Sequence, residues 1–132
     1  MKTAFPFATI LTLLVLPVLP LKSWAESPPT RIGQCAETSV VKVATRLVEA
    51  NNQPVPGSGT VVQFTNGVNL VSYETVPQAE ASRPGDKVTM CLKSVPKNCP
   101  PGDNRGKFYT VTNMRTKKVF TLPDSQHMCG GA

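Results

Sequence analysis

Aromatic residues are scarce in this chain of 132 residues, at 6% of the sequence. The single tryptophan, Trp24, lies near the N-terminus, and the aromatic residues after it are Phe64, Tyr73, Phe108, Tyr109 and Phe120. A short chain with so few large side chains buries little apolar surface, so its core alone stabilises it only marginally. We therefore expect covalent cross-links to contribute to the stability of the fold.

The sequence also lacks the usual metal-binding patterns. It has no Cys-x-x-Cys pair and only one histidine, His127, which argues against a zinc site. The segment 99–106 contains one acid, Asp103, too few oxygen ligands for a calcium loop. A copper site would have to combine His127 and Met128 with Met90 and Met114, but the last two occupy strand positions where core packing explains a methionine. We expect no metal and no cofactor.

Beyond residue 25 the chain has no apolar run long enough to cross a bilayer. Residues 5–21 do form an apolar run, preceded by Lys2 and followed by Ser23-Trp24-Ala25. This order is typical of a signal peptide, with small residues at the cleavage site. A membrane anchor that is never removed is the alternative, but the run is short for one and Pro17 and Pro20 lie late in it. We predict a signal peptide over residues 1–25 and a single secreted β domain over residues 26–132.

Export would bring the four cysteines, Cys35, Cys91, Cys99 and Cys129, into an oxidising compartment. Four cysteines allow three pairings, and a sequence alone cannot select one. The pairing that we favour is Cys35–Cys129 with Cys91–Cys99, because the first ties the two ends of the domain and the second clamps a proline-rich excursion. We expect a secreted or periplasmic protein, and the length of the leader favours a bacterial envelope.

Several segments have the composition of strands. Residues 39–49 fit both an alternating strand pattern and a helical stripe, and their β-branched residues favour the strand. Residues 60–65 and 68–74 flank Asn66-Gly67, which predicts a hairpin with a type I′ turn and with Val62, Phe64, Val71 and Tyr73 on one face. Further strands are expected at residues 87–95, 107–114 and 118–122. In the first of these, Val88, Met90 and Leu92 share one face and Cys91 lies on the other.

Residues 26–34 are expected to form a loose arm, and residues 51–59, 77–85 and 96–106 are expected to be loops, because proline and glycine are frequent in them. No segment predicts a helix with certainty. About five to six short strands separated by turns favour an all-β fold, a small antiparallel β-barrel or sandwich held together by disulfides.

Charge is divided unevenly along the chain. Residues 26–82 contain three bases and five acids, whereas residues 83–132 contain nine bases and three acids, a balance of +6. Such an asymmetry favours an anionic partner, although a solvated basic face would look the same. We predict a non-enzymatic domain that binds an anionic macromolecule or envelope component, with contacts from the basic half: Arg105, Lys107, Arg115, Lys117 and Lys118.

Other sequence features bear on three further functions. The stiff loop 99–106 presents Asp103 and Arg105, which either contact a target or shape the turn, so a secreted inhibitor of an extracellular or envelope hydrolase is the second hypothesis. Asp124, Ser125 and His127 resemble a catalytic set, but three neighbours in one extended segment rarely converge. Nucleic-acid binding through Phe108 and Tyr109 is not expected, because adjacent strand residues face opposite sides. The oligomeric state cannot be deduced.

Overall fold

A computed structural model describes residues 2–6, 10–20 and 26–131 of the chain. Residues 2–6 and 10–20 are exposed and carry no helix or strand. The cleavage site expected at Ser23-Trp24-Ala25 lies outside the described residues, so the signal peptide stays a prediction. Within the described residues, no helix has the length and apolar character needed to cross a membrane.

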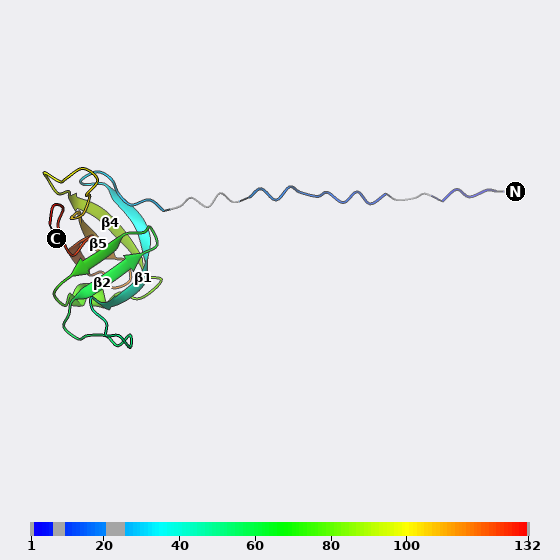
Figure 1. Cartoon of the computed structure of the whole chain (residues 1–132). Helices are drawn as coiled ribbons and strands as arrows, with labels where there is room; N and C mark the ends of the chain where they lie inside the picture. Colours follow the sequence, from blue (N-terminus) through cyan, green and yellow to red (C-terminus); the bar gives the residue numbers. More distant parts are fainter. Residues whose placement is uncertain (1, 7–9, 21–25, 132) are drawn as a thin grey trace.

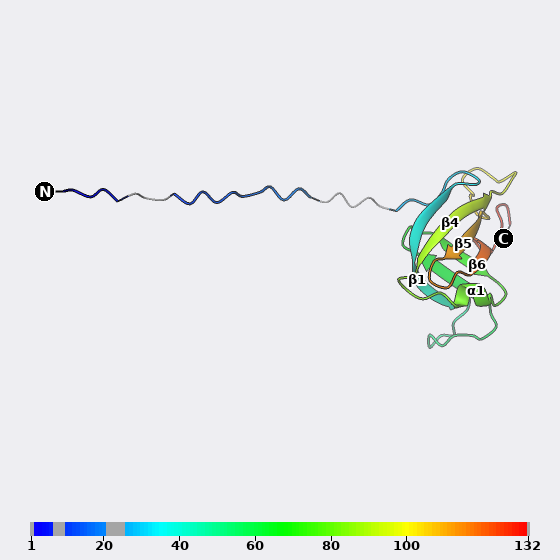
Figure 2. The same cartoon turned by 180° about the vertical axis from the view of Figure 1, so that it is seen from behind.

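The described residues form six β-strands and one helical turn. The strands make a single antiparallel sheet that curls into a half-barrel (Figures 1 and 2). The strand order is β3-β2-β1-β4-β5-β6, and the edge strands β3 and β6 approach each other without pairing. The all-β class and the number of strands are confirmed. The elements are β1 (Cys35–Thr45), β2 (Thr60–Phe64), β3 (Asn69–Ser72), α1 (Pro77–Glu80), β4 (Lys87–Ser94), β5 (Phe108–Asn113) and β6 (Val119–Pro123).

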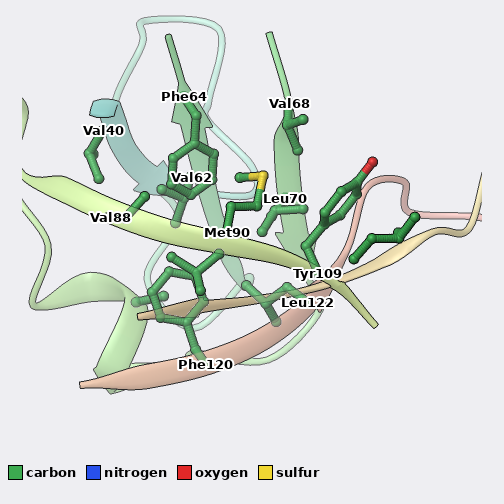
Figure 3. Packing of buried hydrophobic residues seen from close by; sticks show 13 residues of the cluster. Val40, Val62, Phe64, Val68, Leu70, Val88, Met90, Tyr109, Phe120 and Leu122 are labelled. Atoms are coloured by element: carbon green, nitrogen blue, oxygen red, sulfur yellow. The ribbon is translucent and has the colours of Figure 1, made fainter. Parts of the chain in front are cut away.

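The core fills the concave side of the curled sheet (Figure 3). Alternate residues of each strand point inward, so Val88, Met90 and Leu92 of β4 are buried as predicted. Side chains from β2 and β3 meet those of β4, β5 and β6 across this interior (Figure 3). The buried apolar cluster comprises Val40, Val62, Phe64, Val68, Leu70, Ala79, Val88, Met90, Leu92, Tyr109, Val111, Phe120 and Leu122.

Strand β1 joins the two halves of the sheet. Its first part, Cys35 to Ser39, pairs with β4, and its later part pairs with β2, with a register shift between Val40 and Lys42. Such a shift bends a strand and increases its twist, which lets one strand turn the corner of the half-barrel. The strand interpretation of this segment is confirmed, but the strand begins at Cys35, four residues earlier than expected and directly after the expected arm, and it ends at Thr45.

The β2–β3 hairpin forms, but the type I′ turn and its register were wrong. Val62 pairs with Leu70 rather than with Val71, and the Phe64 amide donates to the Val68 carbonyl at 3.0 Å, which leaves a three-residue loop. Gly67 has a φ of 87°, whereas Asn66 does not have a positive φ. A shift of one residue exchanges the two faces of a strand. Tyr73, expected inside, is 52% exposed, whereas Val71, expected on the same face, is buried.

The side chain of Asn66 explains this register. Asn66 is buried, its amide donates to Thr38 Oγ1, and its Nδ2 donates to Met90 Sδ. Its Oδ1 accepts a hydrogen bond from the Val68 amide, which closes the turn from inside. Thr38 belongs to β1 and Met90 to β4, so the turn type depends on strands that are distant in sequence.

Helix α1 is a single turn within the segment expected to be a loop. Ala79 is fully buried, and the helix packs against β1, β2 and β6, where it covers one end of the half-barrel (Figure 2). Thr60 Oγ1 accepts the Val76 amide and donates to Glu80 Oε1, which fixes the helix on β2. So short a helix has too few residues to produce an amphipathic pattern, so the sequence did not reveal it.

All four cysteines are in disulfides, but the favoured pairing was wrong. The bonds are Cys35–Cys91 and Cys99–Cys129, which close loops of 56 and 30 residues. Cys35 lies directly opposite Cys91 on the outer face of β1 and β4, a position that the early start of β1 creates. In the chain-entropy treatment each bond stabilises the fold by about 4 kcal/mol.

Candidate functional site

The residues expected to bind a partner lie at the two ends of β5. Lys107 precedes the strand, and Arg115, Lys117 and Lys118 follow it. Because a strand of this length spans about 20 Å, they form two groups, one at each end of β5. The structure therefore presents two separate basic regions.

The first region joins the loop 99–106 to the segment 124–131. Arg105 forms a two-bonded ion pair with Asp103, with Nε–Oδ1 and Nη2–Oδ2 distances of 2.9 Å. Asp103 also accepts the Gly130 amide at 2.9 Å, and Arg105 donates to the Gly131 carbonyl at 3.1 Å. The Arg105 guanidinium, followed by the Gly130 amide, holds the pKa of the Asp103 carboxyl well below its usual range. Both side chains thus hold the loop against the C-terminal segment.

The three residues that resemble a catalytic set in the sequence do not converge in the structure. Asp124 Oδ1 accepts the amides of Gly106 and Lys107, at 2.8 and 3.1 Å, so this carboxylate holds the start of β5. Ser125 Oγ accepts the backbone amide of His127, whose side chain is exposed. A nucleophile and its base need side chains within hydrogen-bond reach of each other. Among the described residues no hydrogen bond joins the side chains of Ser125 and His127.

The methionines that a copper site would need lie far apart in the structure. Met90 is fully buried in the core, whereas Met114 and Met128 are exposed after β5 and in the C-terminal segment. Within the part of the chain that the structure describes, no group of three or more histidine, cysteine, aspartate or glutamate side chains is placed to hold a metal ion.

The second region is built around Asp86, whose side chain is 8% exposed. Arg115 donates to both carboxylate oxygens, at 2.7 and 2.9 Å, and Asn113 Nδ2 and the Arg83 amide donate at 2.9 and 2.8 Å. The Arg115 hydrogen bonds are the main cause that holds the pKa of the Asp86 carboxyl well below its usual range. Arg115 also reaches the Ala81 carbonyl, so Asp86 and Arg115 bind the turn before β4 to the turn after β5.

The turn after β5 holds Lys117 in an unusual backbone conformation. Asn113 Oδ1 accepts the amides of Arg115 and Thr116, and the Asn113 carbonyl accepts the Lys117 amide at 2.8 Å. Lys117 has a φ of 60° and is exposed. Among the described residues, only Asn52 and Asn98 share a positive φ without being glycine, and asparagine tolerates that region better than lysine.

We call the second region the basic end and define it as Arg83, Lys87, Arg115, Lys117 and Lys118. Its five bases are accompanied by three acids, Asp86 and the Glu26 and Glu37 that line a cleft with Lys87, which leaves a local balance of +2. All five bases are exposed, and of these five only Arg115 forms an ion pair within the part of the chain that the structure describes. Lys87 lies beside Glu26, whose pKa is lowered by hydrogen bonds from Thr65 and Thr38 and by the charge of Lys87.

Two clefts were not anticipated from the sequence. One, of about 350 Å³, lies between the end of β3 and the C-terminal segment, where Tyr73 and Met128 contribute apolar surface. Arg46 lies 4.5 Å from the Tyr73 ring centre and donates to Gln126. The other, of about 260 Å³, is lined by Glu26, Glu37, Thr38, Ser39 and Lys87. Both combine residues far apart in sequence, so the sequence offered no signal for either cleft.

No protein-family model matches this chain, and neither a curated protein nor a solved structure is significantly similar to it. Function must therefore be inferred from the charges and contacts of the chain itself.

Proposed function

We propose that this protein is an exported, non-enzymatic domain that binds an anionic macromolecule or envelope component through its basic end. The observation that carries the proposal is the conformation of Lys117, which is exposed at a φ of 60°. Backbone strain of this kind persists where the surrounding structure enforces it, and it is often found at functional positions. A glycine or asparagine would form the same turn at lower cost, so a lysine there suggests a role for its charge.

The surroundings of the turn support this role. The buried pair of Asn113 and Asp86 holds the turn in one conformation, so its lysines are displayed by a rigid backbone. A binding surface that is already ordered loses less entropy when a partner binds. Arg115 contributes mainly to this rigidity, because both carboxylate oxygens of Asp86 engage its guanidinium. Lys117 and Lys118, with Arg83 and Lys87, are left to contact the partner.

Export to the envelope or the exterior belongs to the same proposal. Disulfides form and persist in oxidising compartments, and the two disulfides here stabilise a domain with a small core. The proposed surroundings, a bacterial periplasm or the exterior, also contain the anionic polymers and lipid surfaces that a basic domain attracts.

Retention on immobilised heparin, eluted with a salt gradient, tests the electrostatic mechanism. The double variant Lys117→Gln/Lys118→Gln should lose about fivefold in affinity for each lysine removed. The matched control, Lys93→Gln/Lys97→Gln, removes two exposed lysines from the opposite end of β4 and should bind nearly as well as the wild type. Binding that stays unchanged from low to high ionic strength would contradict the mechanism. If only the control variant loses affinity, the binding site lies at the opposite end of β4 instead.

One observation favours the inhibitor hypothesis as a second candidate. The Cys99–Cys129 disulfide and the Asp103–Arg105 pair order the loop 99–106 before any partner arrives. Because those two charges shape the loop, the exposed Asn104 is the better residue to test. Asn104→Arg should abolish inhibition of a target hydrolase without changing the melting temperature. Full inhibition by this variant would count against the hypothesis.

A further inference from the structure

Two exposed apolar side chains lie within the basic end. Met114 is 46% exposed and Val119 is 51% exposed, although each adjoins the lysine-bearing turn. Their neighbours Asn113 and Phe120 point into the core. Val119 alternates with the buried Phe120 and therefore projects from the outer face of the sheet. Met114 follows β5, and its Sδ accepts a hydrogen bond from Thr89 Oγ1 on the same outer face.

Strand pairing places these apolar side chains among the bases. Val88 pairs with Asn113, so the next position opposes Lys87 to Met114, and the Met114 amide donates to the Lys87 carbonyl at 2.9 Å. On the other side Met114 leads into the turn that carries Lys117. Val119 pairs with Thr112, in the next row of the same outer face. The surface therefore places two apolar side chains beside Lys87, Lys117 and Lys118, with Glu37 further along the row of Val119.

We propose that the basic end docks on an anionic lipid bilayer, with Met114 and Val119 entering the interface and the lysines contacting the phosphate groups. This inference rests on the proposed function and narrows its partner to a lipid surface. A soluble polyanion can form ionic contacts with the lysines, but it provides no apolar environment for an exposed methionine and valine. A bilayer supplies both kinds of contact, because its anionic headgroups lie directly above hydrocarbon.

The charge pattern agrees with such docking. Three acids lie near this surface: Asp86, which is buried and paired with Arg115, and Glu26 and Glu37, which line a cleft with Lys87. The five bases of the basic end outnumber them. The face presented to the membrane thus keeps a net positive charge. Two apolar side chains enter only the headgroup region, so binding should be reversible and should weaken as salt increases.

The test compares variants of the oxidised protein isolated from a secreting host, all with the same N-terminus as established by mass spectrometry. Each is sedimented with vesicles of phosphatidylcholine alone, and with vesicles of phosphatidylcholine and phosphatidylglycerol in equal parts. Retention on heparin is measured in parallel. The apolar variants are Met114→Ser and Val119→Thr, and Val95→Thr is the control, an exposed valine just after the opposite end of β4.

Met114→Ser and Val119→Thr should each weaken binding to the anionic vesicles about threefold to fivefold while leaving heparin retention unchanged. Lys117→Gln should weaken both, and Val95→Thr should weaken neither. Unchanged vesicle binding by both apolar variants, or an equal loss on heparin, would overturn the lipid inference and leave the polyanion proposal standing. Failure of the wild type to bind either probe would overturn both. Melting temperatures of the variants distinguish a lost contact from a lost fold.

Discussion

Replacing Lys117 by glycine separates the conformational cost of the basic turn from its charge. At a φ of 60° the lysine side chain crowds its own backbone, which costs an L-residue roughly 1–2 kcal/mol. Glycine avoids this cost but loses about 0.5–1 kcal/mol through the greater freedom of the unfolded chain. The variant Lys117→Gly should therefore be more stable than the wild type by about 0.5–1 kcal/mol. For a domain of this size the melting temperature should rise by about 4 °C.

The same variant should bind its anionic partner more weakly, by about fivefold. Lys118→Gly is the matched control, because Lys118 is adjacent, exposed and does not have a positive φ. It removes the same charge but gains no conformational relief, so it should lower the stability by about 0.5–1 kcal/mol. The assays are thermal unfolding by circular dichroism and retention on heparin.

Opposite changes in stability with similar losses of binding would support a functional lysine in a strained turn. If Lys117→Gly melts at or below the wild-type temperature, the turn is not strained and the reasoning fails. If it is more stable and binds as tightly as the wild type, the lysine has no role in binding.

Four other substitutions test individual contacts. Gly59→Ala should destabilise the domain by about 3 kcal/mol or more, seen in urea titration, because Gly59 has a φ of 120° and a Cβ there would lie 2.0 Å from the Ser72 carbonyl oxygen. Asp86→Ala should cost about 3 kcal/mol, since it leaves the partners of a buried carboxylate unsatisfied, and this too would appear in the urea midpoint. The depressed pKa of Asp86 implies stability that is present above about pH 4, the unfolded value, and is lost as the pH falls through the lower folded value. Acid titration of Asp86→Asn should therefore show a flatter loss below pH 4, and an unchanged acid profile would contradict the role of this carboxylate. Glu26→Gln should show a smaller effect of the same sign, because Glu26 is exposed.

The strands themselves were readable because their evidence is local. The alternation of Val88, Met90 and Leu92 marks a half-buried strand whatever else surrounds it. Proline and glycine marked the loops for the same reason. The small number of aromatic residues also indicated that disulfides would be needed, and all four cysteines are paired.

The details of pairing were less readable because they depend on neighbours that the sequence does not place. Asn66-Gly67 favours a type I′ turn in isolation, but Asn66 finds partners in Thr38 and Met90 and turns inward. The favoured disulfides failed similarly, because the register of β1 on β4 sets Cys35 opposite Cys91. Only the folded sheet establishes that register.

The candidate site, too, could be predicted from the sequence only in part. A count of charges along the chain correctly located the excess of bases after residue 82, because charge is a property of composition. It could not tell that Arg105 serves its own loop or that Arg115 is held by Asp86, 29 residues away. Composition and periodicity thus determined the class of fold, the need for cross-links and the sign of the charge. The tertiary structure alone decided which cysteines meet and which bases face the solvent, since both depend on contacts between residues that only folding brings together.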